Sequence, residues 1–376
     1  MVKNKSFMFF VAHLGFGGAQ KMATFVMNEL VEHGCDVSVV AYYETNEVVK
    51  LDGRVRRYFI DLTYVSENVS DVSRHINNMK AIFRFKRVIE RINADVAVMF
   101  GPDAISNIAL RKSAFKGKVI QCERGDLLAR SSLHQAVLRK AFASADLAIF
   151  QTPNAMKDYG DSIPGNVSII PNPCLERKDI CRESTMLKDK IVSAGRLVPE
   201  KGFDILIESF AIVHKRFPNF KLEIYGEGPC RNQLESLIAS LSLQEYVCLP
   251  GAVDDVAKKY CDARLFVLSS KFEGLPNSLI EAMVLGVPVV ATDCRPGGAS
   301  FLTKNGTIGG PIVPVDDFVS MAKQIVCLLD NTEAAEVYGQ KGKSIAYDFS
   351  PDNVRAMWMN AFDSLWLDNG ENENEL

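Results

Sequence analysis

Residues 271–293 read KFEGLPNSLIEAMVLGVPVVATD and place a proline between two glutamates that lie eight positions apart, Glu273 and Glu281. Proline lacks a backbone N–H and is tolerated at the first turn of a helix, so Pro276 predicts a helix start. We therefore expect Glu273 in a loop and Glu281 on the helix that follows.

Apolar runs flank this segment at residues 263–270 and 287–293, and each has the character of a buried strand. The unit is therefore strand, loop, helix and strand. Because ligands of open parallel sheets bind beyond the carboxyl ends of the strands, both glutamates are expected at one crevice. The alternative is a surface or capping role for Glu273 and a solvated helical position for Glu281.

The same alternation of strand-like and helix-like runs continues along the chain and predicts an α/β fold with two doubly wound, Rossmann-like units. The other strand-like runs are residues 7–13, 36–43, 95–100, 118–122, 146–150, 191–197, 221–228 and 246–253. Two prolines and a charged, weakly patterned run interrupt the order after residue 170. The expected parts are a first domain at 1–170, a linker at 171–189, a second domain at 190–350, a closing helix at 351–366 and an acidic tail at 367–376.

The composition limits the functional classes. The chain has 376 residues, 47% of them hydrophobic, with a net charge of −3 and a pI near 6.0, which argue against a dedicated nucleic-acid binder. Residues 1–150 hold 21 Lys and Arg against 15 Asp and Glu, so this part carries +6 and the remainder −9. Nine cysteines without CxxC spacing fit neither a disulfide framework nor a zinc site, so a cytoplasmic location is expected. No run approaches the ~18 apolar residues that a spanning helix needs, so any membrane contact is expected to be peripheral.

A glycine-rich turn, HLGFGGAQKMA (residues 13–23), follows the first strand-like run and precedes a helix. Free N–H groups and the dipole at a helix start favour an anion there. The turn fits a dinucleotide fingerprint in part, because Gly15 and Gly17 match G-x-G but Gln20 stands at the third glycine position. With Glu44 as a ribose ligand, a dehydrogenase remains an alternative, as does a turn whose glycines only redirect the chain.

The second half of the chain carries cationic candidates. SAGRLVPEKGFD (193–204) ends a strand-like run with glycine and then presents Arg196 and Lys201 in the connecting loop. A guanidinium and an ammonium placed in this way suit a diphosphate, since both can neutralise charge on a departing phosphate. The alternative is a solvated charge pair. YGEGP (225–229) ends the next run, where Gly226 would let a nucleotide approach the backbone.

The helix of the opening segment completes this set. Its first N–H groups, at Asn277, Ser278 and Leu279, are expected to point toward the same crevice and to hold phosphate. The carboxylates would then take neutral hydroxyls, Glu281 those of a ribose and Glu273 those of the sugar beyond the phosphates.

In combination these motifs resemble the retaining nucleotide-sugar glycosyltransferases of family 4, which have the GT-B fold. The resemblance rests on GRLVPEKG, YGEGP, the E-x7-E pattern of EGLPNSLIE and the continuation AMVLGVPVVATD. It covers essentially the whole chain and is sharpest in residues 190–317. It implies an acceptor-binding domain and a nucleotide-sugar-binding domain that face each other across a cleft, with the helix at 352–366 crossing back to the first domain.

The resemblance also implies roles for single residues. It places Arg196 and Lys201 at the donor diphosphate, Glu281 at the ribose, Glu273 at the donor sugar, and Gly17 and Gly18 at the donor phosphate side of the cleft. Many members carry a histidine in the first domain near the donor sugar, whereas here the comparable strand end reads QCERGD (121–126) and offers Glu123 and Arg124. DCRPGGASFL (293–302) is similar to members that build bacterial lipid-linked or surface polysaccharides.

For the mechanism we expect a same-face displacement, in which the departing diphosphate helps to take the acceptor proton while Arg196 and Lys201 stabilise the developing charge. A carboxylate nucleophile on the far face of the sugar is the alternative, as in retaining glycosidases. The DD pairs at 254–255 and 316–317 suit helix starts better than a metal motif, so we expect transfer without a metal or another cofactor.

The segment KAIFRFKRVIER (80–91) combines Ile82, Phe83 and Phe85 with five basic side chains. The basic residues are Lys80, Arg84, Lys86, Arg87 and Arg91. A basic amphipathic helix can lie on an anionic membrane. The alternative is an ordinary packed helix with a solvated basic face.

These expectations describe a cytoplasmic hexosyltransferase, in peripheral contact with the inner face of the membrane. Its donor would be a UDP-sugar carrying a hexose or N-acetylhexosamine, and its acceptor a glycan, lipid-linked in our expectation, in O-antigen, capsule or lipopolysaccharide assembly. Three alternatives remain: a sugar-nucleotide epimerase of the same fold, an NAD-dependent dehydrogenase, and a non-catalytic sugar-nucleotide-binding protein. No nucleic-acid partner is expected.

Overall fold

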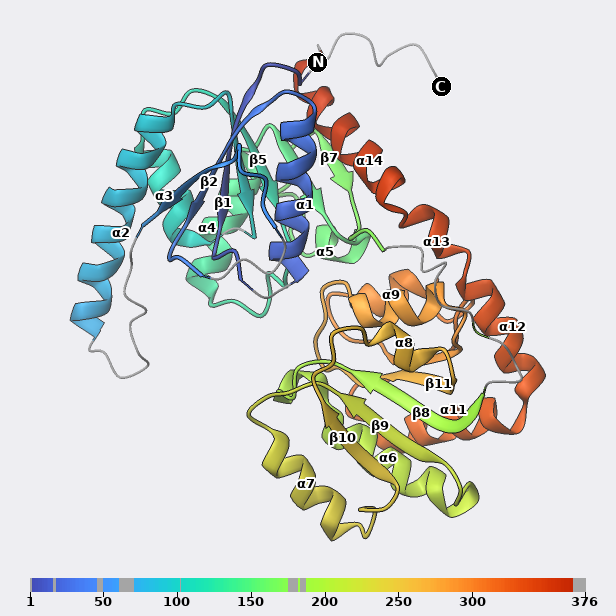
Figure 1. Cartoon of the computed structure of the whole chain (residues 1–376). Coiled ribbons are helices and arrows are strands. Elements are labelled where there is room, and N and C mark those ends of the chain that lie inside the picture. The colour runs from blue at the N-terminus through green and yellow to red at the C-terminus, as the bar shows by residue number, and fades with distance from the viewer. Residues whose placement is uncertain are drawn as a thin grey trace. The chain divides into compact units, whose positions relative to one another are not determined.

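The computed structural model describes residues 2–15, 18–45, 50–60, 71–101, 103–174, 182 and 187–367, without the side chains of residues 71–75. The chain forms two compact units (Figure 1). The first unit comprises Met1–Pro171 and Val354–Leu376, and the second unit comprises Asn172–Asn353. The first unit is therefore discontinuous in sequence, because the end of the chain returns to it.

The first unit contains a seven-stranded parallel sheet with the order β3-β2-β1-β4-β5-β6-β7. Its strands are β1 (Ser6–Val11), β2 (Asp36–Ala41), β3 (Arg56–Phe59), β4 (Val96–Phe100), β5 (Lys118–Cys122), β6 (Leu147–Phe150) and β7 (Val167–Ile169). Its helices are α1 (Gly18–Glu32), α2 (Asp71–Ile92), α3 (Ala104–Lys112), α4 (Ser132–Ala143), α5 (Pro153–Lys157) and α14 (Pro351–Asp363), whose first residues belong to the second unit.

Strand β1 shows how helices cover both faces of this sheet. Its sequence, SFMFFV, is apolar on both sides, as expected for a strand of a fully covered parallel sheet. Phe7 and Phe9 pack in one cluster with residues of α1 and α14, whereas Met8 and Phe10 pack in another with residues of α2 and α3. The alternation of side chains along the strand thus assigns these helix pairs to opposite faces.

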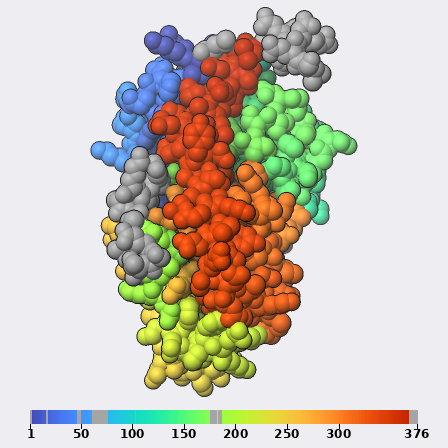
Figure 2. All heavy atoms as spheres, turned by 90° about the vertical axis from the view of Figure 1, so that its right-hand side faces the viewer, coloured from blue at the N-terminus to red at the C-terminus, as the bar shows by residue number. Residues whose placement is uncertain are grey.

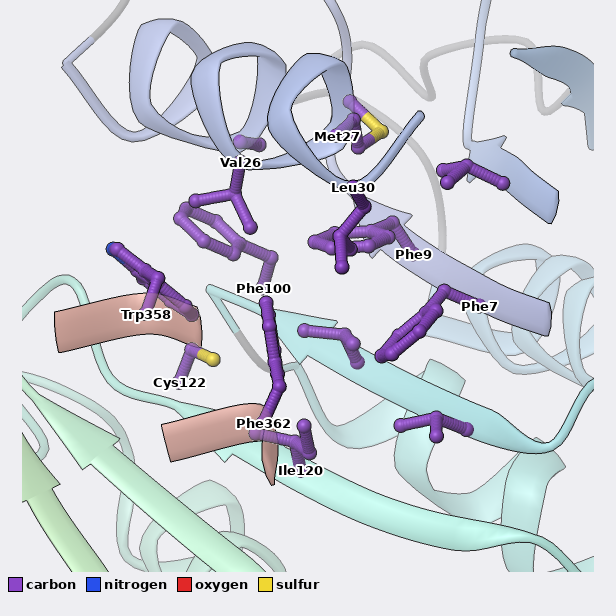
Figure 3. Close-up of a cluster of buried hydrophobic side chains, with 14 of the residues drawn as sticks. Phe7, Phe9, Val26, Met27, Leu30, Phe100, Ile120, Cys122, Trp358 and Phe362 are labelled. Carbon is purple, nitrogen blue, oxygen red and sulfur yellow. The ribbon is translucent and has the colours of Figure 1, made fainter. Parts of the chain in front are cut away.

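Helix α14 is part of the core of the first unit. Trp358 and Phe362 are almost fully buried, and their rings lie 5.9 Å from Phe100 and 5.3 Å from Phe7, centroid to centroid (Figure 3). In the space-filling view the helix, in red, lies at the surface between the blue start of the chain and the green residues of the same unit (Figure 2). Phe7 and Phe362, 355 positions apart in sequence, thus share one hydrophobic cluster.

The second unit contains a six-stranded parallel sheet with the order β10-β9-β8-β11-β12-β13. Its strands are β8 (Lys188–Ala194), β9 (Lys221–Tyr225), β10 (Val247–Gly251), β11 (Ala263–Leu268), β12 (Val289–Thr292) and β13 (Ile312–Val313). Its helices are α6 (Phe203–Arg216), α7 (Arg231–Ser240), α8 (Ala257–Tyr260), α9 (Asn277–Val284), α10 (Gly298–Leu302), α11 (Phe318–Asp330), α12 (Thr332–Gly342) and α13 (Ile345–Asp348). Clusters of buried side chains cover both of its faces.

The two parallel sheets confirm the predicted fold class. The strands that sequence reasoning missed are β3, β7 and β13, and all three lie at sheet edges. An edge strand is covered on fewer sides, so its sequence need not be an apolar run, and β3 reads RRYF with every residue partly or fully exposed. Among the residues described, no helix combines the length and the hydropathy that crossing a membrane requires.

Candidate functional site

The site residues predicted in the second half lie in loops at one edge of the second sheet and on helix α9, which follows one of these loops. The loops that follow β8, β11 and β12 are neighbours there, because β8 pairs with β11 and β11 pairs with β12, all in parallel. A short 3-10 turn, Pro199–Lys201, brings Lys201 to this edge, and Glu273 lies in the loop after β11. Both therefore occupy the carboxyl edge, where ligands of parallel sheets bind.

Glycines allow these loops to approach closely. A Cβ on Gly226 would lie 1.9 Å from the carbonyl oxygen of Gly195, and one on Gly202 would lie 2.2 Å from that of Ser269. The N–H of Gly226 donates to Gly251 at 2.9 Å. Gly226 thus serves the contact between strand ends, whereas the sequence suggested that it leaves backbone free for a nucleotide.

Lys201 and Glu273 form an ion pair between the Nζ and Oε1 atoms. Their side chains are 20% and 16% exposed, so the pair is mostly shielded from water. Ser270 Oγ, at the end of the run LFVLSS, also lies 3.4 Å from Glu273 Oε1. The sequence predicted both charges at one edge but gave no reason to expect them in direct contact, and it did not single out Ser270.

The loop that carries Glu273 is fixed on both sides. The N–H of Glu273 donates to the carbonyl of Arg295 at 2.9 Å, in the loop after β12. On the other side, the N–H of Lys271 donates to Glu200 at 2.8 Å, and Ser269 Oγ donates to the Lys201 carbonyl at 2.9 Å. These bonds fix the backbone of the two loops that carry the carboxylate and the ammonium.

The segment DCRPGGASFL supports this loop by close packing. A Cβ on Gly298 would lie 2.1 Å from the carbonyl oxygen of Gly274, which leaves no room for a larger residue. Cys294 is 1% exposed, and its burial, with a smaller contribution from Glu273, raises the pKa of its thiol to about 12. Cys294 is thus a buried, protonated neighbour of the ion pair and no nucleophile at neutral pH.

Helix α9 begins directly after Pro276, as the opening segment predicted. The N–H groups of Leu279 and Ile280 already donate to the Pro276 carbonyl at 3.1 Å. The expectation that Leu279 offers a free N–H is therefore wrong, and at this tip only Asn277 and Ser278 keep N–H groups without a backbone acceptor among the described residues. The side-chain oxygen of Asn277 accepts from Asn172 at 3.0 Å.

Glu281 lies one turn further along α9 and is half-buried. The pKa of Tyr260 is raised well above its usual value, mainly by burial and also by the charge of Glu281. Tyr260 is therefore a buried neighbour of Glu281, and sequence reasoning did not name it. Arg196 follows β8 at the same edge and is exposed, and its side chain has no hydrogen-bond partner in the described part of the chain.

The first unit presents its own candidates at the carboxyl edge of its sheet. Gly17 lies outside the described residues, and Gly18 is the first residue of α1. His13 Nδ1 accepts the N–H of Gly15 at 3.1 Å, and Glu44 is exposed.

Of the DD pairs, both of which lie in the second unit, Asp317 caps α11 by accepting the N–H of Ser320 at 2.8 Å.

Of the three apolar residues that the sequence singled out on helix α2, only Phe83 is exposed. Phe85 is 1% exposed and belongs to the core, and Ile82 packs against the same cluster. The apolar side chains at the surface are Ile76, Met79 and Phe83, which are 50%, 60% and 61% exposed. Positions 76, 79 and 83 are spaced for one helical face, so α2 has an exposed apolar stripe.

Comparison with known proteins identifies the chemistry that this fold serves. Residues 188–331 match the family described as Glycosyl transferases group 1. Over 366 residues the chain is 25% identical to an uncharacterized glycosyltransferase of Haemophilus influenzae, which covers 94% of this chain and 99% of that protein. Over 357 residues it is 24% identical to the Campylobacter jejuni GalNAc-alpha-(1->4)-GalNAc-alpha-(1->3)-diNAcBac-PP-undecaprenol alpha-1,4-N-acetyl-D-galactosaminyltransferase, with 93% and 96% covered.

Solved structures agree on the fold. The crystal structure of Anabaena HepE in complex with UDP and glucose superposes with a TM-score of 0.75 at 16% identity, covering 96% of this chain and 100% of that one. The crystal structure of Staphylococcus aureus TarM gives a TM-score of 0.73 at 17% identity, with 96% and 99% covered. The chain is therefore a glycosyltransferase of the GT-B fold whose residues 188–331 match the Glycosyl transferases group 1 family.

Proposed function

We propose that this glycosyltransferase moves a hexose or N-acetylhexosamine from a UDP-sugar to a glycan linked to a lipid diphosphate, with retention of the anomeric configuration, in the assembly of a bacterial surface polysaccharide. The observation that carries the proposal is the shielded ion pair of Lys201 and Glu273 at the carboxyl edge of the second sheet. An ammonium and a carboxylate held there by main-chain bonds suit a ligand with a phosphate at one end and hydroxyls at the other.

The proposed roles follow from this pairing. Donor binding draws Lys201 toward the diphosphate, and Glu273, released from the ammonium, accepts hydrogen bonds from sugar hydroxyls. Arg196 is exposed and free to fold onto the same diphosphate, and the N–H groups of Asn277 and Ser278 give it a second contact. Glu281 accepts the ribose hydroxyls.

The reaction that we propose is a same-face displacement. The bond from the anomeric carbon to the diphosphate oxygen breaks, the acceptor oxygen bonds to that carbon on the same face, and the acceptor proton passes to the departing diphosphate. Negative charge grows on the leaving group, so Lys201 and Arg196 stabilise the transition state more than the ground state. These roles need no metal ion, and we propose that transfer is metal-independent.

The donor and acceptor classes are supported by the names of related proteins. One solved structure of the same fold, Anabaena HepE, is a complex with UDP-glucose. Two Campylobacter jejuni relatives, 24% and 25% identical, are named as N-acetylgalactosaminyltransferases that act on diphospho-undecaprenol acceptors. A lipid-linked acceptor also suits the excess of 21 basic over 15 acidic residues in positions 1–150.

We further propose that α2 rests on an anionic membrane surface on the cytoplasmic side. Its exposed stripe of Ile76, Met79 and Phe83 would enter the headgroup region. Arg87 lies 5.9 Å from the ring centroid of Phe83, so a cation borders the stripe and can face lipid phosphates.

A donor screen tests the proposal. Purified protein is incubated with UDP-, GDP- and dTDP-sugars and a short-chain lipid diphosphate that carries one to three sugars, and products are followed by mass. We expect one added hexose or N-acetylhexosamine with a UDP-sugar, unchanged by chelator and absent in Glu273→Gln. Conversion of the donor sugar without acceptor would instead indicate an epimerase, and turnover only after metal is added would contradict the mechanism.

A further inference from the structure

The loop after β5 leaves a guanidinium with N–H groups that have no acceptor. Arg124 lies over two aromatic rings, with its Cζ 4.7 Å from the centroid of Phe100 and 5.2 Å from that of Trp358. Its Nη1 donates to the carbonyl of Ile170 at 3.4 Å, but its Nε and Nη2 are buried without an acceptor among the residues that the structure describes. The indole Nε1 of Trp358, a residue that is 2% exposed, is likewise buried with no acceptor in the described part of the chain.

The acidic neighbour of this guanidinium attracts its positive charge but forms no ion pair with it in the described chain. The carboxylate of Glu123 accepts the backbone N–H groups of Arg124 and Gly125 at 3.0 and 2.8 Å. It also accepts from Arg130 Nη2 at 3.2 Å and from the hydroxyl of Tyr159. Glu123 therefore fixes the loop, and in the described chain Arg124 takes part in no ion pair.

Arg124 keeps its charge despite its surroundings. Burial is the main cause that lowers the pKa of Arg124, to about 10, which is still far above neutral pH. A buried charged donor without an acceptor loses its hydration and gains little in return. A water molecule could bond to the N–H groups but could not neutralise the charge, whereas an oxyanion would do both.

The position of these groups suits a ligand. Arg124 comes two residues after the end of β5, at the carboxyl edge of the first sheet. On the neighbouring strand, Gly101 follows β4 with a φ of +75°, and a Cβ there would meet no atom within 4 Å. The N–H of Gly101 donates to Cys122 at 3.1 Å, so this open space lies beside the same loop. In Figure 3 the nitrogen-bearing edge of Trp358 points away from the packed side chains.

We infer that Arg124 and Trp358 form an oxyanion site in the first unit that takes a phosphate group of the lipid-diphosphate acceptor. The forked N–H groups of arginine match two oxygens of one phosphate, and the indole N–H supplies a third donor. Glu123 is a positioning residue: it holds the loop that carries Arg124 and does not contact the anion. The identity of the anion rests on the proposed function, while the existence of an oxyanion site does not.

Fluorescence of Trp358 gives a direct test, because the indole forms part of the site. The chain has two tryptophans, so Trp366→Phe leaves one reporter. Inorganic pyrophosphate and a short-chain prenyl diphosphate are titrated into this background, into the same protein with Arg124→Gln, and into a control with Lys201→Met. We expect a saturable change that weakens at least tenfold with Arg124→Gln and persists with Lys201→Met.

The outcomes separate this inference from the proposed function. No response to either anion, or a response that Lys201→Met abolishes and Arg124→Gln does not, would overturn it. Saturation by prenyl diphosphate alone shows that the site binds the diphosphate of a lipid. Equal saturation by pyrophosphate shows that the phosphate groups are bound without a contribution from the lipid. The titration requires no transfer, so an inactive enzyme that still binds would contradict only the proposed function. If Arg124→Gln does not fold, Arg124→Lys replaces it, with severalfold weaker binding expected because the fork is lost.

In the transfer assay the same variant should raise the KM for the acceptor and leave the KM for the donor unchanged. A purely structural role would move both constants, or the melting temperature alone. Circular dichroism and a thermal melt of each variant therefore accompany the kinetics.

Discussion

Replacing Lys201 by methionine tests the ion pair on which the proposed donor site depends. The variant keeps the length and apolar stem of the side chain and removes the charge. It leaves the Glu273 carboxylate with Ser270, whose hydroxyl lies at 3.4 Å, as its remaining side-chain partner in the described chain. Exposed pairs contribute about 0.2–1 kcal/mol, and loss of one partner of a fully buried pair costs about 3–5 kcal/mol.

At 20% and 16% exposure this pair lies between the two cases, so we expect the second unit to lose about 1–2 kcal/mol. For a unit of this size, that corresponds to a fall of roughly 2–8 °C in melting temperature. The effect on catalysis should be larger, because the ammonium is proposed to face the departing diphosphate. Loss of one such group typically costs about 10²–10³ in kcat.

A double-mutant cycle with Glu273→Gln separates stability from catalysis. The double variant should be more stable than the sum of the single losses predicts, by about 1 kcal/mol, because neither charge is then left alone. Lys201→Arg is the matched control, which should keep most of the stability and part of the rate. Additive losses in urea unfolding, or a Lys201→Met enzyme within threefold of the wild-type kcat, would refute this account of the site.

Three further measurements test other parts of the structure. Gly226→Ala should destabilise the second unit by more than about 2 kcal/mol in urea unfolding, because the new methyl meets a carbonyl oxygen and the φ of Gly226 is +142°. The control Gly53→Ala, whose new methyl would meet no atom within 4 Å, should change stability little. Phe83→Ser should reduce flotation with anionic liposomes at low salt, and wild-type protein that stays unbound there would contradict the membrane proposal. Burial raises the pKa of Cys294 to about 12, so its thiolate fraction at pH 8 is very small and becomes large only near pH 12. Iodoacetamide at pH 8 should therefore modify the exposed Cys248 first. Rapid labelling of Cys294 in folded protein would contradict its burial.

The sequence predicted most of the fold because buried parallel strands must be apolar on both faces. Runs such as VAVMF and LFVL are recognisable for that reason, and Pro276 indicated the start of α9. Strand β3 was missed because an edge strand can carry charges, as RRYF does. On α2 the sequence grouped Phe83 with Phe85, because apolar spacing alone does not distinguish the side that packs, with Phe85, from the side that stays exposed, with Phe83.

Within the site, residue types and loop positions were accessible to sequence reasoning, but contacts were not. Lys201 and Glu273 are 72 residues apart, and only the pairing of β8 with β11 makes their loops neighbours. The sequence marked Arg124 as a departure from the family pattern. It could not show that two of its nitrogens, Nε and Nη2, lack an acceptor in the described chain, or that its guanidinium lies over Trp358, which arrives from the other end of the chain.

The return of α14 to the first unit has a consequence for biogenesis. During synthesis on the ribosome, β1 to β7 emerge before Trp358 and Phe362, and the whole second unit is made in between. In sequence the second unit lies wholly between these parts, so it can fold while the first unit still exposes the apolar side chains that α14 later covers. Nascent chains that stall before residue 350 should therefore be captured by chaperones through their N-terminal portion, and release from the chaperone should coincide with the packing of α14 onto the first unit.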